Sequence, residues 1–393
     1  MVVACFLAWV VSVSAAPQSI SVNYKVVNNF PVKYVAVNLN DPEVTVTTAL
    51  ATRFPTGLES WNSIINRLHP DALINGTYFS LRTNMPVGDI AVGGDLIYRG
   101  VVGTALCITP DNRVAFRPGP QQCKPDWHGY QSVLCAGPRL LTDGVETVNA
   151  WEEGFRDPHV LGSATRSAVA WRPDNSLLLL TVETNISLTN LAYVCKGLGA
   201  TQAMCLDGGT SSGLYANGRS VTTPGRSVSN VLVIYNSPAH FQQVAGECMP
   251  VVLPVLARLT TPRRPMLPGG PAPVSAGDPE LVASVIKPPP PTLVKITNLV
   301  PAQAVQGVVP VVIEVIRDKR MTWTSLRIDG QLRAMTNIWP MQFQWDSTKE
   351  LDGMHLLEVT AWTQEQEMLS RNAIQVRVHN TEKVADVGTT RQP

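Results

Sequence analysis

The chain has 393 residues, of which 45% are hydrophobic, and its 31 basic and 30 acidic side chains leave a formal net charge of +1. Such a length predicts two folded units rather than one. The balanced charge creates no long-range field, which excludes nucleic acid and anionic membrane surfaces as main partners.

An apolar stretch opens the chain and reads MVVACFLAWVVSVSAAPQ. It is shorter than a membrane-spanning helix and ends in small residues, as a secretory signal does, so we assign residues 1–16 to a signal region. A lipoprotein signal at Cys5 is a weaker alternative, because no apolar region precedes this cysteine. The prediction is a secreted or extracytoplasmic protein without a transmembrane segment.

Six cysteines follow the signal region, an even number that is compatible with disulfides outside the cytosol. Cys107 with Cys123 and Cys195 with Cys205 are candidate local pairs, although other connectivities stay open. The cysteines lack the C-x-x-C spacing of zinc sites, which argues against a zinc centre.

Residues 17–248 are predicted to form the first domain. From 19 to 235, short apolar or β-branched runs alternate with turn signals, a pattern typical of strands. Helical spacing of apolar residues predicts helices over 57–69 and 187–200. We expect an α+β fold of mostly antiparallel sheets with a few helices. Hairpin turns are predicted at 92–95, 109–113 and 172–176.

The composition changes after the first domain. Prolines crowd residues 249–306, which predicts an extended linker, with 280–287 and 292–297 as candidate edge strands. Residues 307–380 repeat short strands separated by turns, as in a small all-β immunoglobulin-like sandwich. This segment resembles bacterial modules appended to secreted enzymes, which is compatible with association with the cell surface. Residues 381–393 are predicted to be a disordered tail.

The stretch CLDGGTSSGLYANGRS at 205–220 concentrates an acid, glycines and hydroxyls. A predicted strand delivers Asp207 to its end and a second strand follows. Gly208 and Gly209 permit backbone conformations that other residues avoid. Backbone N–H groups beside the hydroxyl of Ser211 suit an anionic or polyhydroxylated ligand. The local sequence supports equally well an aspartate that only caps its own turn.

Residues 209–213 also fit the G-x-S-x-G pattern, which would make Ser211 a hydrolase nucleophile. That pattern needs a helix directly after the serine, whereas a strand is predicted here. The later histidines lie near the linker or in the second unit, so a serine hydrolase is disfavoured.

Five motifs occur in the order INGTYF, AGPRLLTDG, TRSAVAW, GLGA and CLDGGTSSGLY, and GRSVSNVLVIY follows them. Together they resemble the phosphodiester glycosidase family over about residues 70–236. The resemblance implies a glycosidase that hydrolyses the anomeric bond of a sugar-1-phosphodiester. The implied sugar is similar to N-acetylglucosamine, and the implied target is a cell-surface glycan or an exopolysaccharide.

Three motifs depart from the family pattern, and in one of them the family's R-T-A becomes Arg166-Ser167-Ala168. Where the family usually has N-L-D-G-G-G-S, this chain has Cys205 for the asparagine and Thr210 for the third glycine, while Asp207 is retained. The stretch that commonly reads V-D-G contains Glu183 and Thr184 instead. These departures motivate an alternative function, a non-catalytic carbohydrate-binding or cell-surface protein on the same scaffold.

Cleavage at the anomeric carbon has an oxocarbenium-like transition state and needs carboxylates there, together with positive charge at the phosphate. We assign Asp207 as nucleophile or base. Glu183 is the preferred second carboxylate, with Asp89 and Asp143 as weaker candidates. Arg166 is the candidate phosphate ligand, because its guanidinium can donate two parallel hydrogen bonds.

Asn75 is predicted to hydrogen-bond a sugar hydroxyl, although it also begins a glycosylation sequon. The remaining predicted substrate-binding residues are Gly76, Tyr78, Gly208, Gly209 and Ser211. We expect no required cofactor. A divalent cation stays an option, since no cluster has dedicated ligand spacing.

Overall fold

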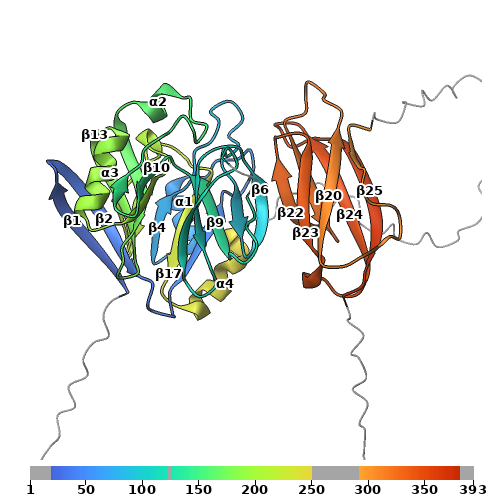
Figure 1. Cartoon of the computed structure of the whole chain (residues 1–393), viewed down its shortest axis with the longest axis horizontal. Helices are drawn as coiled ribbons and strands as arrows, with labels where there is room; N and C mark the ends of the chain where they lie inside the picture. The colour runs from blue at the N-terminus through green and yellow to red at the C-terminus, as the bar shows by residue number, and fades with distance from the viewer. Residues whose placement is uncertain (1–18, 123–124, 250–291, 381–393) are drawn as a thin grey trace, which may run out of the picture.

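The computed structural model describes residues 19–122, 125–249 and 292–380, which form a larger N-terminal domain beside a smaller C-terminal module (Figure 1). The predicted signal region, the proline-rich part of the linker and the predicted tail lie outside these residues. The helices of the described part are α1 (Trp61–Leu68), α2 (Pro158–Leu161), α3 (Leu188–Gly197) and α4 (Pro238–Cys248).

Local signals explain where the helices begin. Ser60 caps α1 by accepting a hydrogen bond from the Ser63 backbone, and Ser187 caps α3 in the same way. The predicted helices are therefore confirmed. Helix α4 was not predicted, although Ser237 caps it and Pro238 opens its first turn, a readable start signal.

The first sheet of the N-terminal domain has seven strands, and each pairs antiparallel with its neighbours. Their order is β1 (Ile20–Val27), β2 (Phe30–Asn38), β13 (Ser176–Ile186), β12 (Ala164–Trp171), β14 (Gln202–Cys205), β10 (Arg139–Thr142) and β11 (Val145–Glu146).

The second sheet has five strands, also antiparallel. Their order is β16 (Arg219–Thr222), β15 (Leu214–Ala216), β4 (Ala72–Asn75), β17 (Asn230–Tyr235) and β3 (Thr45–Leu50). The short turns between strands carry left-handed residues such as Asn217 and Gly218, so the Asn-Gly hairpin signal is confirmed.

A third sheet continues from the N-terminal domain into the module. The domain contributes β8 (Val114–Pro118), β7 (Thr104–Ile108), β9 (Ser132–Ala136), β5 (Ile90–Val92) and β6 (Asp95–Arg99). The module contributes β22 (Gln331–Thr336), β21 (Trp323–Ile328), β24 (Gly353–Trp362), β25 (Met368–Val378) and β19 (Ala304–Val305). Strands β22 and β6 pair in parallel and join the two parts.

The module is completed by a separate three-stranded sheet. It contains β18 (Val294–Ile296), β20 (Val308–Val315) and β23 (Met341–Asp346). A buried cluster around Trp345 fills the space between the two sheets of this sandwich. Strands β18 and β19 lie inside the range predicted as linker, so the folded module begins earlier in the chain than the composition indicated.

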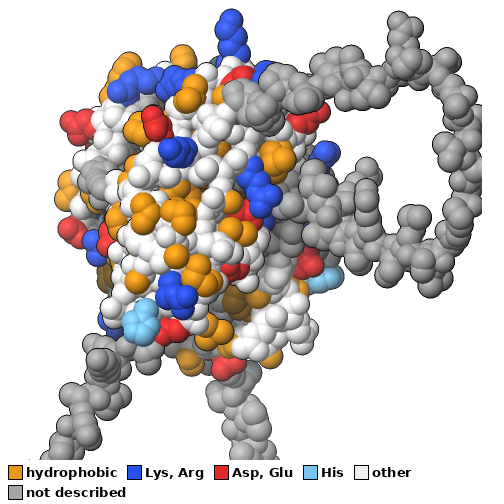
Figure 2. Space-filling model, turned by 90° about the vertical axis from the view of Figure 1, so that its right-hand side faces the viewer, with side chains coloured by type: hydrophobic (Ala, Val, Ile, Leu, Met, Phe, Trp, Pro, Cys, Tyr) orange, Lys and Arg blue, Asp and Glu red, His pale blue; other side chains and the backbone are white. Residues whose placement is uncertain are grey.

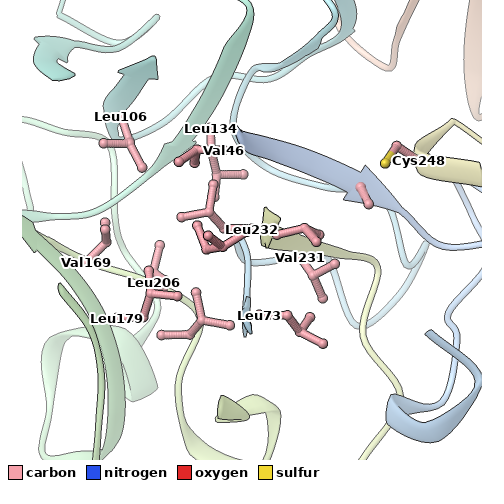
Figure 3. Packing of buried hydrophobic residues seen from close by; sticks show 14 of the residues in the cluster. Val46, Leu73, Leu106, Leu134, Val169, Leu179, Leu206, Val231, Leu232 and Cys248 are labelled. Atoms are coloured by element: carbon pink, nitrogen blue, oxygen red, sulfur yellow. The ribbon is translucent and has the colours of Figure 1, made fainter. Parts of the chain in front are cut away.

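The main core lies where the sheets of the N-terminal domain face one another. Figure 3 shows side chains from different sheets directed into one interior, and all of them belong to a single buried cluster. The seven-stranded sheet provides Val169 and Leu179, the five-stranded sheet Leu73 and Leu232, and the third sheet Leu134. Antiparallel sheets around a shared core confirm the predicted α+β class.

The module packs against this core as well as pairing with its edge. Trp323 and Trp362 stack with ring centroids 5.2 Å apart and belong to the same buried cluster as Phe54 and Tyr98. Figure 2 shows the face of the molecule on the module side, where acidic and basic side chains are interspersed with apolar ones. No helix within the described residues is long and apolar enough to cross a membrane.

The cysteines do not form the predicted local pair. Cys195 and Cys205 are both free and buried in the apolar cluster around α3, so that disulfide prediction is wrong. Burial raises the pKa of both thiols, which keeps them protonated. Cys107 is also free, and its suggested partner Cys123 lies outside the described residues.

Candidate active site

Asp207 lies where the chain crosses from the first sheet to the second. Strand β14 ends at Cys205, the short 3-10 helix η1 (Gly209–Ser211) follows, and β15 then enters the five-stranded sheet. Because β14 and β15 belong to different sheets, the segment is a crossing between layers and not a hairpin turn. An acid at such a crossing is close to the ends of both sheets.

The carboxylate of Asp207 is buried but has hydrogen-bonding partners. Its Oδ1 accepts from the Gly208 backbone N–H at 2.9 Å, and its Oδ2 is 3.4 Å from Nη2 of Arg226. Burial raises the pKa of Asp207 to about 6, and the hydroxyl of Ser211 and the charge of Arg226 offset only part of this rise. The group therefore titrates near neutral pH, as groups that transfer protons or attack as nucleophiles commonly do.

The two glycines after Asp207 are needed for different reasons. Gly209 has a φ of +59°, which glycine adopts without strain. Gly208 has an ordinary φ of −125°, so the predicted special conformation is wrong for this residue. A Cβ at Gly208 would instead come within 2.8 Å of the Thr165 carbonyl oxygen. Close packing, not backbone freedom, requires glycine there.

Asn75 holds the backbone of Asp207 in place through hydrogen bonds. Its Nδ2 donates to the Asp207 carbonyl at 2.6 Å, and its Oδ1 accepts from Ser167 Oγ at 2.7 Å and from the Gly213 N–H at 3.0 Å. With 1% of its surface exposed, Asn75 is not free to contact a sugar, contrary to the prediction. Gly76 likewise accepts the Asp207 N–H at 3.0 Å. Both are positioning residues.

A cavity of about 670 Å³ opens beside Asp207. Of the predicted site residues, those that line it are Tyr78, Arg166, Asp207, Gly208 and Gly209. Ser211 is fully buried behind them and accepts a hydrogen bond from Arg226 Nε at 2.6 Å. The size is within the range of small-molecule sites.

Arg166 is buried in the wall of this cavity. Its Nη2 donates to the carbonyl oxygens of His159, Val160 and Gly162, which ties the α2 segment to the wall. Its Nε–H has no partner within the described part of the chain. This Nε atom is itself buried, so it is not exposed to a ligand in the cavity, and most of the guanidinium holds the α2 segment in place.

Arg226 is a site residue that sequence reasoning missed. It bridges Asp207 and Ser211, stacks with its guanidinium carbon 4.5 Å from the centroid of the Phe79 ring, and keeps about a third of its side chain exposed. Arg226 lies in the motif GRSVSNVLVIY, but this motif alone assigns no role to its arginine. Its pairing with an aspartate nineteen positions earlier could not be read from spacing.

Glu183 does not reach the cavity. It is exposed on β13 and forms a 2.7 Å ion pair with Lys33 on β2, the neighbour of β13 on the side away from β12 and β14. The prediction of Glu183 as second carboxylate is thus not supported by its position.

Asp143 is exposed and accepts a hydrogen bond from Gln202, and Asp89 is buried beside Trp127 and Arg99. Asp157, at the start of α2, lines the cavity instead.

Two alternatives from the sequence, a bound divalent cation and a serine nucleophile, have little support in this geometry. Among the described residues, no group of three or more His, Cys, Asp or Glu side chains could hold a metal ion. Ser211 contacts Arg226 and Asp207, and within the described ranges no histidine is bonded to it. A serine nucleophile activated by histidine is therefore not formed here.

The cavity lies within a region that matches a known protein family. Residues 69–235 match the family model described as phosphodiester glycosidase. No curated protein matches the sequence.

Several solved structures resemble the chain, and two of them come from Synechocystis and zebrafish. A hypothetical protein from Synechocystis is 17% identical with a TM-score of 0.49, and the match covers 56% of this chain and 64% of that one. The zebrafish N-acetylglucosamine-1-phosphodiester alpha-N-acetylglucosaminidase catalytic domain, auto-inhibited by its pro-peptide, is 18% identical with a TM-score of 0.46, covering 56% and 85%. The family match over 69–235 is the finding that bears on function.

Proposed function

Because residues 69–235 belong to the phosphodiester glycosidase family, we propose that the protein hydrolyses the anomeric bond of a sugar-1-phosphodiester in the cavity beside Asp207. The observation that carries the proposal is a buried carboxylate with a pKa of about 6 beside a partly exposed arginine on the same cavity. The N-acetylglucosamine-like sugar and the glycan target inferred from the motifs are part of the proposal.

The reaction needs positive charge at the phosphate. The leaving group is a phosphate monoester, already an anion, so donors and cations can replace much of a general acid. Arg226 lines the cavity and is about a third exposed, which suits a phosphate ligand. The backbone at Gly209 lines the same cavity and is a further candidate contact for the phosphate.

The reaction also needs an ionised carboxylate at the anomeric carbon. Asp207 serves there, either as the nucleophile or as the base that activates water. Asp157 replaces Glu183 as the second carboxylate, because it lines the same cavity. Hydrogen bonds from the backbone and side chain of His159 lower the pKa of Asp157. Two carboxylates with pKa values shifted in opposite directions are a recurring arrangement in glycoside hydrolysis.

We also propose an extracytoplasmic location. The leader-like composition of residues 1–16 supports it, whereas the free cysteines remove the argument from disulfides. Association with the cell surface through the C-terminal module is part of the same proposal.

Hydrolysis of N-acetylglucosamine-1-phosphate methyl ester in ¹⁸O-labelled water tests the reaction. Cleavage of the anomeric bond places the label on the sugar and leaves methyl phosphate unlabelled. Label in the phosphate would reveal attack at phosphorus and contradict the proposal. Absence of sugar release across pH and added divalent cations would also contradict it. Tight binding without turnover would then favour the alternative, a carbohydrate-binding protein on this scaffold.

A further inference from the structure

We infer that the alcohol esterified to the phosphate of the substrate is hydrophobic, an alkyl chain or an apolar ring and not a second sugar. This inference rests on the proposed reaction, since it concerns the part of the substrate that leaves with the phosphate, and it replaces the glycan target with an apolar alcohol. It follows from the uneven distribution of polar and apolar side chains around the cavity.

One side of the cavity is an apolar wall formed by Tyr78, Val87, Val102, Phe155 and Val160. All five belong to, or pack against, one buried hydrophobic cluster. Tyr78 and Phe155 meet edge to face with ring centroids 5.4 Å apart, which fixes both rings. The wall is therefore a rigid surface and not a set of mobile side chains.

This wall offers few hydrogen bonds to a hydroxylated ligand. Its one side-chain polar atom, the Tyr78 hydroxyl, is 3.5 Å from the Cys205 sulfur. A sugar placed against the wall would lose hydrogen bonds to water without replacing them, which is unfavourable. An apolar group placed there would release water from apolar surface on both sides.

Most polar residues of the lining fall into two groups. Asp207, Gly208, Gly209, Thr210 and Arg226 form one group, which suits the phosphate and the reacting sugar. Arg156, Asp157 and His159 form the other, which lies between Phe155 and Val160 in the chain and is exposed to solvent. Once the anomeric carbon is fixed at Asp207, the alcohol esterified to the phosphate occupies the part of the cavity that the sugar leaves open. The volume of about 670 Å³ is large enough for both parts of a drug-sized ligand.

Two esters of N-acetylglucosamine-1-phosphate that differ only in the alcohol test the inference. With wild type, we expect kcat/KM for the octyl ester to exceed that for the methyl ester by at least about tenfold. The two dissociation constants are measured in parallel on Asp207→Asn, where turnover does not interfere, and we expect the same preference. Equal values for both esters in binding and in turnover would overturn the inference.

The two proposals fail in different ways. If neither ester is hydrolysed but the octyl ester binds more tightly, the proposed reaction is wrong and the apolar subsite stands. If both are hydrolysed at the same rate and bind equally, the reaction stands and the hydrophobic alcohol is wrong.

A pair of adjacent valines provides a matched control. Val102 lines the cavity and is half-buried, whereas Val101 is 43% exposed and is not part of the lining. Val102→Ser should lower the octyl-to-methyl ratio about threefold or more, because it removes one methyl group from the wall and replaces the other with a hydroxyl. Val101→Ser should leave the ratio unchanged. Equal effects of both variants would point to nonspecific adsorption of the octyl chain and overturn the assignment of the wall.

Discussion

Two regions of the N-terminal domain bury an aspartate beside an arginine. Asp207 accepts from Gly208 and lies 3.4 Å from Arg226, while Asp89 accepts from the Gly100 N–H at 2.7 Å and lies 3.6 Å from Arg99. Burial raises the pKa of both carboxyl groups. By charge, burial and partner the two sites are nearly the same.

The regions differ in what lies next to the carboxylate. Asp207 and its arginine both line the large cavity, so a ligand can reach them together. Asp89 is fully buried and accepts from Trp127 Nε1 at 2.6 Å. Its partners Arg99 and Trp127 line a second cavity of about 380 Å³ near the module, but Asp89 itself lines neither cavity. A perturbed pKa is therefore evidence for a functional site where a ligand can reach the carboxylate itself.

Loss of the Asp207 carboxylate should have the largest effect. We expect Asp207→Asn to lower kcat/KM at least about a thousandfold, because the amide can neither attack nor accept a proton. The melting temperature should stay within a few degrees of wild type. Asp89→Asn is the matched variant and should leave the kcat/KM of the folded protein unchanged. Activity retained in Asp207→Asn would remove this residue from catalysis.

Neutralisation of Arg226 should have the next largest effect on activity. Arg226→Gln removes the charge assigned to the phosphate, for which we expect kcat/KM to fall about a hundredfold or more. Arg219→Gln, on exposed β16, serves as control and should change kcat/KM less than about twofold. If both variants behave alike, Arg226 is not a phosphate ligand.

The same comparison makes a prediction about stability. Asp89→Asn should lower the free energy of unfolding by about 1–3 kcal/mol, because the amide nitrogen cannot accept the hydrogen bond that the buried Trp127 Nε1 donates to the carboxylate. Chemical denaturation measures this difference. If Asp89→Asn were as stable as wild type but inactive, Asp89 would be the functional acid and the roles of the two regions would be reversed.

These residues also show how far the sequence alone could lead. Helical apolar spacing is a local signal, and the helices over 57–69 and 187–200 were predicted from it, whereas α4 was missed despite its serine cap. The choice of Asp207 as the candidate acid also rested on its local motif and the order of the motifs. The partners of Asp207 could not be predicted in this way, since the ion pair with Arg226 depends on how two sheets meet. The prediction of Glu183 failed because strand pairing turns it toward Lys33.

The raised pKa of Asp207 predicts how stability depends on pH. The folded-state pKa of about 6 lies above the ordinary value of 3.8, so folding favours the protonated form. Stability is then fully present below pH 4 and falls as the pH rises toward 6, by about 2–3 kcal/mol at this site. The Asp207→Asn variant has no carboxyl group to ionise at this position, so it does not lose this stability as the pH rises. Its stability relative to wild type, measured by denaturation at pH 4 and pH 7, should therefore increase by about that amount at pH 7. An unchanged difference between the two pH values would show that burial does not perturb this carboxyl group.

Glu183→Gln should have the smallest effect of all. Its ion pair with Lys33 is about half-exposed, and such pairs contribute about 1 kcal/mol or less. We expect kcat/KM within about twofold of wild type, whereas Asp157→Asn, on the cavity lining, should lower it at least tenfold. The opposite result, with Glu183 essential and Asp157 dispensable, would mean that β13 approaches Asp207 when substrate is bound. It would then restore the carboxylate pair that the sequence motifs suggested.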